Sequence, residues 1–131
     1  MTPELTYLAW TLVLALGQVG IAAVGKRTQE PPMWGAGARD GDPPHYTGVA
    51  ARLIRAQTNL FETLPLFAAA VLVAHVAGRE GTLTHWGAAL FFWARLVYLP
   101  LYAAGVPYIR TLVWIAGVVG LCLVLVAALL P

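Results

Sequence analysis

The sequence predicts an all-α integral membrane protein, an up-down four-helix bundle, on three observations. Sixty per cent of its 131 residues are hydrophobic and only eleven per cent are charged, whereas soluble domains carry about 25% charged residues. Four apolar segments each approach the ~20 residues that a helix needs to cross a bilayer. Most connections between them are short, which favours antiparallel neighbours. The length fits one domain, which we expect to span residues 1–131.

The first predicted helix runs from about Leu5 to Gly25, where its apolar residues end. The polar loop that follows is rich in glycine and proline and cannot cross a membrane. The second helix is expected to begin between Thr47 and Arg52 and to end near Gly78. Pro65 lies inside it and should kink the helix or remove a backbone hydrogen bond.

A short turn at residues 78–81 leads to the third predicted helix, from about Leu83 to Ala104. The sequence Gly-Val-Pro at residues 105–107 then breaks the chain, and the fourth helix is expected from about Ile109 to Leu130.

Positive charge in the short loops predicts the orientation in the membrane. Four of the eight lysines and arginines lie in or beside the first loop, and Arg110 follows the third loop. The turn between the second and third helices holds only Arg79, which Glu80 offsets. We therefore expect a multi-pass protein with both termini outside and the first and third loops in the cytoplasm. The positive residues at the first loop are Lys26, Arg27, Arg39 and Arg52.

Polar residues form a stripe on the second predicted helix. At ~100° per residue, Arg55, Asn59 and Glu62 fall within roughly 60° of each other on one face, while the other faces are apolar. Ionisable side chains inside a membrane span are costly and usually face a partner, a cavity or a ligand. The stripe therefore predicts a functional site.

The third predicted helix carries a matching stripe of Arg95, Tyr98 and Tyr102. Arg95 lies ten residues before Gly105 and Glu62 lies ten residues after Arg52, so both should be ~15 Å deep. We expect Glu62 and Arg95 to be partners, directly or through a ligand. Gln18 should lie slightly shallower, whereas the outer half of the bundle should be nearly featureless.

A simpler hypothesis is a buried Glu62–Arg95 pair that only fixes helix register. It leaves Arg55, Arg110 and the two tyrosines without a role. The excess of basic and donor groups suits a small anionic ligand that enters from the cytoplasm.

Other classes of function find little support. The net charge of +2 and the absence of a basic patch with interleaved aromatics argue against nucleic acid. His75 and His85 have no further ligand at metal-binding spacing, so we expect no metal site. The single Cys122 sits in an apolar run as a small hydrophobe. The expected partners are membrane lipids and a small molecule.

Two motifs resemble one known family, the membrane-associated proteins in eicosanoid and glutathione metabolism (MAPEG). The segment Arg-Ala-Gln-x-Asn-x-x-Glu-x-x-Pro-Leu-Phe at residues 55–67 resembles the second-helix signature of leukotriene C synthases and microsomal glutathione transferases. The segment Ala-Arg-Leu-x-Tyr-x-x-x-Tyr at residues 94–102 resembles their third-helix signature, and Arg110 falls where their fourth helix begins with an arginine.

The resemblance implies a homotrimer that binds glutathione as co-substrate between neighbouring subunits, in the cytoplasmic half. It implies that Arg110 is catalytic and stabilises the glutathione thiolate, and that Gln57 and Arg110 approach from the adjacent subunit. The glutathione-binding residues it implies are Arg55, Gln57, Asn59, Glu62, Arg95, Tyr98 and Tyr102.

This chain departs from the family pattern at two positions. Thr63 replaces the tyrosine that follows the second-helix glutamate in some members, and Trp114 stands where some carry a tyrosine one turn after the fourth-helix arginine. The second, lipophilic substrate is left undefined. Two functions follow: a transferase or peroxidase that uses glutathione against lipophilic electrophiles or hydroperoxides, or a non-catalytic ligand-binding or scaffold protein with the same fold.

Overall fold

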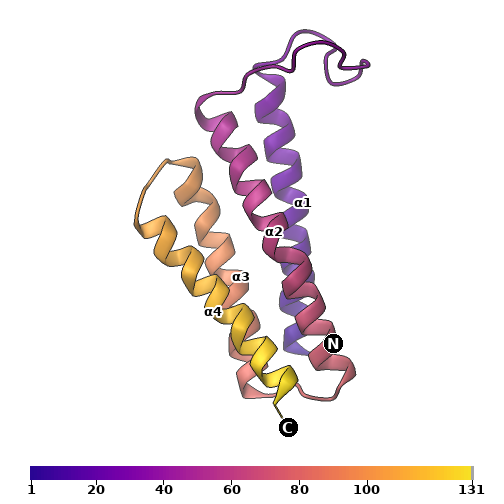
Figure 1. Ribbon diagram of the computed structural model, residues 1–131, viewed down its shortest axis with the longest axis vertical. Helices are drawn as coiled ribbons and strands as arrows, with labels where there is room; N and C mark the ends of the chain where they lie inside the picture. The colour runs from indigo at the N-terminus through magenta and orange to yellow at the C-terminus, as the bar shows by residue number, and fades with distance from the viewer. Residues whose placement is uncertain (131) are drawn as a thin grey trace.

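The computed structural model describes residues 1–130 as four long helices. They run side by side along the long axis of the molecule and alternate in direction (Figure 1). This confirms the predicted all-α four-helix bundle, and each helix begins and ends within two residues of the predicted position. The helices are α1 (Pro3–Arg27), α2 (Gly48–Val76), α3 (Thr82–Ala103) and α4 (Ile109–Leu129).

Three of the helices, α1, α2 and α4, are long and apolar enough to cross a membrane. The remaining helix, α3, has a similar length of 22 residues but carries Arg95, His85 and two tyrosines, which lower its hydropathy. Helix α2 continues without interruption through Pro65. Arginine is tolerated in α3 because its side chain points into the bundle, where it is 1% exposed.

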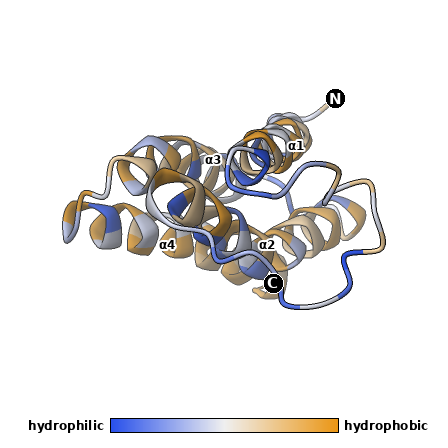
Figure 2. Cartoon of the chain, turned by 90° about the horizontal axis from the view of Figure 1, so that it is seen from above, coloured by the Kyte–Doolittle hydropathy of each residue, from blue (hydrophilic) through white to orange (hydrophobic). Residues whose placement is uncertain are grey.

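The hydrophobic core lies in the half of the bundle that holds the chain termini. Phe67 of α2 stacks on Phe91 of α3 with their ring centroids 4.0 Å apart, and Val71 and Val124 are fully buried beside them. Within the described residues α1 contacts α2 and α3 but not α4, so α1 and α4 occupy opposite corners of the bundle (Figure 2).

Helices α3 and α4 approach most closely at a pair of glycines. A Cβ atom added to Gly120 would lie 2.6 Å from the carbonyl oxygen of Gly87, and one added to Gly87 would lie 2.7 Å from the carbonyl oxygen of Gly120. One turn before Gly120, a Cβ on Gly117 would meet Ala94 at 3.5 Å. Small residues at such crossings let membrane helices pack backbone against backbone, and this crossing sets the spacing between the two helices.

The terminal half of the bundle is not featureless, contrary to our expectation. Thr2 donates a hydrogen bond to Glu80 at 2.8 Å, Nδ1 of His75 lies 3.0 Å from the same carboxylate, and Thr84 donates to the buried Glu4 at 3.1 Å. These contacts fasten the start of α1 to the α2–α3 turn. Polar residues near helix ends gave no periodic signal in the sequence, because each of them is an ordinary capping or turn residue on its own.

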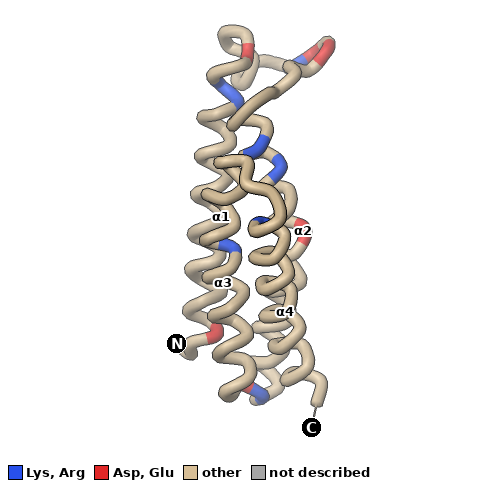
Figure 3. The backbone as a smooth tube through the Cα atoms, turned by 90° about the vertical axis from the view of Figure 1, so that its left-hand side faces the viewer, with Lys and Arg blue, Asp and Glu red and all other residues tan. Residues whose placement is uncertain are grey.

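Apart from Arg79 in the α2–α3 turn, the lysines and arginines gather in the opposite half of the bundle, toward the α1–α2 and α3–α4 connections (Figure 3). Arg52 belongs to this group, and its Nε donates to the carbonyl oxygen of Ala103 at 2.9 Å. That bond ties the start of α2 to the end of α3 and fixes the register of the two helices where the polar residues lie.

Candidate functional site

A cavity of about 340 Å³ opens between α2, α3 and α4 in the basic half of the bundle. Its volume falls at the low end of the range typical of small-molecule sites. All six of its lining residues carry a hydrogen-bonding group on the side chain, and four of them are predicted site residues. The lining residues are Asn59, Tyr98, Tyr102, Arg110, Thr111 and Trp114.

Arg95 forms the floor of this polar region. Its Nη1 donates to Oδ1 of Asn59 at 2.7 Å, and its guanidinium carbon lies 4.4 Å from the ring centroid of Tyr98. The Nε and Nη2 groups of Arg95 are buried and have no hydrogen-bond partner among the described residues. A buried guanidinium with two unsatisfied N–H groups has a strong tendency to take an additional acceptor.

Two further arginines gather around Tyr102. The guanidinium carbon of Arg110 lies 4.4 Å from the ring centroid of Tyr102, and Nε of Arg55 donates to the Tyr102 hydroxyl at 3.2 Å. Tyr98 and Tyr102 pack edge to face with their centroids 5.4 Å apart. The electron-rich ring faces hold the cations close together, and the resulting positive potential favours an anion.

The backbone places Arg110 at the start of α4. The amide of Ile109 donates to the carbonyl oxygen of Pro107 at 2.6 Å, and Tyr108 between them has φ 57° and ψ −62°, which is a γ-turn of the strained kind. Arg110 is the second residue of the helix that follows. Unpaired N–H groups and the helix dipole make such a helix start favourable for negative charge.

The structure brings together six of the eight predicted site residues. Asn59, Tyr98, Tyr102 and Arg110 line the cavity, and hydrogen bonds connect Arg95 to Asn59 and Arg55 to Tyr102. The two predicted site residues outside this group are Gln57 and Glu62.

Glu62 and Arg95 do not form the direct contact that their depths predicted. Among residues 1–130 no ion pair joins them within 4.0 Å, and Glu62 is exposed. The depths agree, because the Arg52 side chain lies beside Gly105. The direction differs, since Asn59 faces Arg95 while Glu62 lies on the exposed side of α2. Glu62 remains on the same face of α2 as Asn59.

Trp114 lines the cavity although sequence analysis did not assign it to the site. It lies four residues after Arg110 and therefore on the same face of α4. Its indole Nε1 is buried and has no hydrogen-bond partner in the described structure. The helical spacing from Arg110 is the signal that could have identified it.

Gln18 is the one polar residue of α1 at the depth of the site. It is 3% exposed, and neither atom of its amide group has a hydrogen-bond partner in the part of the chain that the structure describes. Glu4 of α1 contacts Thr84 of α3, 80 residues further along the chain. Because the two helices run parallel, the same offset of 80 residues places Gln18 at the level of Tyr98. Gln18 thus extends the polar layer behind the cavity.

Comparison with known proteins agrees with this geometry. The family model described as the MAPEG family matches residues 5–130. No curated protein and no solved structure matches the chain. Family membership supports, at the level of the family, a membrane function in glutathione-related or eicosanoid metabolism. The match covers nearly the whole chain and joins a four-helix bundle with membrane-spanning helices, so the chain belongs to the MAPEG family and is an integral membrane protein.

Proposed function

We propose that this protein is a glutathione-dependent membrane transferase or peroxidase that acts on lipophilic electrophiles or hydroperoxides. The observation that supports this most directly is the position of Arg110, which lines a cavity between membrane helices with its guanidinium held 4.4 Å from the Tyr102 ring. A fixed cation at the wall of a cavity of reduced dielectric can stabilise an anion that forms there.

The groups around the cavity fit glutathione, which has two carboxylates, a thiol and an ammonium group. Arg55, Arg95 and Arg110 supply positive charge for the anionic groups, and Arg95 has two buried N–H groups without partners. Trp114 adds a third unpartnered N–H donor. Glu62, on the same face of α2 as Asn59, offers a carboxylate for the ammonium group.

Arg110 is the proposed catalytic residue. A free thiol has a pKa near 8.5, so only a small fraction is thiolate at neutral pH. An opposite charge at contact distance typically lowers a pKa by about 1–3 units, and a shift of about 2 units or more would leave the thiol largely ionised at neutral pH. The hydroxyl of Thr111, which also lines the cavity, can donate a further hydrogen bond, although a helix threonine can equally bond to its own backbone. The thiolate is the nucleophile toward a substrate dissolved in the bilayer.

A homotrimer with the site between subunits would explain the exposed charges of α2. Arg55 and Glu62 are both exposed in the single subunit, although each lies within a helix that can cross a membrane. Charged side chains facing lipid are costly, so a neighbouring subunit that covers this face would give them partners. A detergent-corrected mass measurement should give three subunits, and a monomer or dimer would count against the assembly.

Ultraviolet difference absorption tests the proposed role of Arg110. Adding glutathione to detergent-purified protein should produce thiolate absorbance, and Arg110→Ala should abolish the absorbance and turnover. Glutathione binding should weaken only moderately, since Arg55, Asn59 and the tyrosines remain. Arg39→Ala, in the exposed α1–α2 loop, is the matched control and should behave as the wild type.

The same measurement separates the enzyme from a non-catalytic ligand-binding or scaffold protein. Such a protein would bind glutathione without thiolate absorbance. Unchanged thiolate formation in Arg110→Ala would remove Arg110 from the mechanism. Binding of another thiol with the same absorbance would redefine the co-substrate.

A further inference from the structure

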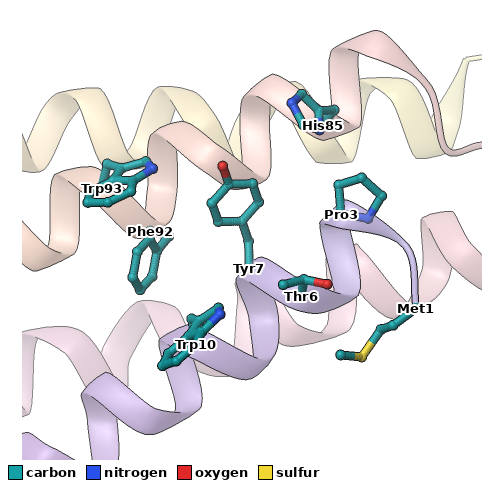
Figure 4. Close-up of a pocket in the computed structure, with 8 residues that line it drawn as sticks. All are labelled: Met1, Pro3, Thr6, Tyr7, Trp10, His85, Phe92 and Trp93. Carbon is teal, nitrogen blue, oxygen red and sulfur yellow. The ribbon is translucent and has the colours of Figure 1, made fainter.

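A second cavity, of about 520 Å³, lies between α1 and α3 in the terminal half of the bundle. It is separate from the site at Arg110, because Trp93 in its wall and Tyr98 in the first cavity lie ~8 Å apart along α3 and ~140° apart around it. Figure 4 shows the side chains that line it: Met1, Pro3, Thr6, Tyr7, Trp10, His85, Phe92 and Trp93.

One face of each helix builds this cavity. On α1, the lining residues Pro3, Thr6, Tyr7 and Trp10 recur at intervals of three or four, as one helical face requires. Tyr7 reaches across toward α3 (Figure 4), where its ring centroid lies 6.2 Å from that of His85 and 5.9 Å from that of Phe92. Tyr7 therefore divides the cavity into an end near the chain terminus and a deeper aromatic end.

Four aromatic side chains bring hydrogen-bonding groups to this cavity. They are the hydroxyl of Tyr7, the indole N–H groups of Trp10 and Trp93, and the imidazole of His85. None of these four side chains makes a hydrogen bond to another of residues 1–130. Trp10 and Trp93 are more than half exposed and lie ~10 Å and ~16 Å from the starts of their helices. At those depths little water is available to serve as a partner.

The arrangement differs from an ordinary interfacial belt of aromatics. Trp86 is such a belt residue: it is 62% exposed on α3 and does not line the cavity. In the cavity, donors from two helices converge on one concave space with mostly apolar walls, which is the usual composition of a small-molecule site. Donors in an apolar space select a ligand that carries an acceptor on an apolar body.

We propose that this cavity binds the acyl chain of a lipid, with its carbonyl oxygen accepting a hydrogen bond from Tyr7. His85 and Tyr7 lie only ~5–6 Å from the starts of α3 and α1, near the depth at which acyl carbonyls meet the membrane surface. Trp10, Phe92 and Trp93 continue deeper along the helices and pack against the chain. A bilayer phospholipid and a free fatty acid both have this chemistry.

Photochemical cross-linking in nanodiscs tests the proposal. One sample contains a fatty acid with a diazirine in its chain, and the other contains phosphatidylcholine with the same diazirine-bearing chain. Mass spectrometry should locate the label within residues 3–10 and 85–93, and excess unlabelled lipid of the same kind should saturate it. Saturable labelling by the fatty acid or by the phosphatidylcholine supports the site, and the sample in which it occurs identifies the source of the acyl chain.

Two matched variants separate the cavity from general lipid exposure. Tyr7→Phe keeps the ring but removes the donor, and it should reduce saturable labelling roughly fivefold or more. Trp86→Phe should leave labelling unchanged. Labelling that follows exposure over all four helices, that does not saturate, or that is equal in wild type and Tyr7→Phe would overturn the proposal. Saturation in the wild-type protein is measured independently of how well either variant folds.

Discussion

The α3–α4 crossing gives the sharpest quantitative test of the fold. In Gly120→Ala, the new methyl carbon would lie 2.6 Å from the carbonyl oxygen of Gly87, 2.8 Å from the amide nitrogen of Phe91 and 3.2 Å from the Cβ of Leu90. Two of these neighbours are backbone atoms, which cannot rotate away, so the helices must separate. Overpacking of this kind costs about 1–3 kcal/mol.

Gly17→Ala is the matched control for the alanine substitution itself. Gly17 lies in α1, and a Cβ atom added there has no other atom within 4 Å. The substitution should therefore show only the helix-forming advantage of alanine, up to about 1 kcal/mol. The same advantage offsets part of the clash in Gly120→Ala, so we expect a net destabilisation of up to about 2 kcal/mol, and of about 1–3 kcal/mol relative to the neutral or slightly stabilised control.

Unfolding in mixed micelles with increasing SDS, followed by circular dichroism, would measure both variants. Gly120→Ala should unfold at lower SDS than the wild type, while Gly17→Ala should unfold at the same SDS or higher. If the two variants shift together, α3 and α4 are not in backbone contact at this point, and the reasoning from the crossing fails. The spacing of α3 and α4 also sets the width of the cavity at Arg110.

Three further outcomes follow from the contacts described. In a double-mutant cycle, the losses of stability in Asn59→Leu and Arg95→Leu should be non-additive by at least about 0.5 kcal/mol. In a second cycle, the losses in Glu62→Gln and Arg95→Leu should add when glutathione is absent and should be non-additive only when glutathione is bound. Additive losses in both states would show that the ligand does not join Glu62 to Arg95. Burial raises the pKa of Glu80, but side-chain hydrogen bonds with His75, Thr2 and Glu4 outweigh it and hold the pKa below 4.5. The stability that Glu80 contributes should therefore be complete well above pH 4.5 and be lost as the pH falls from there through the lowered pKa; Glu80→Gln should flatten that acid-side loss in a thermal-unfolding series. A cysteine introduced at Arg39, with Cys122 replaced by alanine, should react with an impermeant thiol reagent only from the cytoplasmic side, and labelling from outside would reverse the proposed orientation.

The helices and most of the candidate site could be predicted because each depends on residues near one another in the sequence. Apolar length gives the spans, and helical periodicity gives the stripes at Asn59 and at Tyr98 and Tyr102. Their meeting in one cavity needed only antiparallel neighbours. These predictions stay the same if the position of one helix along its neighbour is predicted wrongly by a residue or two.

The direct partner of Arg95 could not be predicted to the residue. The predicted depths of Glu62 and Arg95 agree, but Asn59, one turn away on the same face, accepts the hydrogen bond from Arg95, and Glu62 lies on the exposed side of α2. The contacts that fasten Glu4 and Glu80 at the terminal end were also missed, since they join α1 to the α2–α3 turn across about 80 residues of chain. Such contacts depend on packing in three dimensions rather than on local pattern.

The γ-turn at Tyr108 lowers the stability of the fold but fixes the position of Arg110. Tyr108 is 83% exposed, so its side chain contributes little packing, yet its positive φ typically costs about 1–3 kcal/mol for a residue other than glycine. A screen for variants that survive longer in detergent should therefore favour glycine at this position. The same glycine would make the turn before Arg110 more flexible and its side chain less fixed. The variant that is easiest to purify would therefore be the one least suited to measuring turnover.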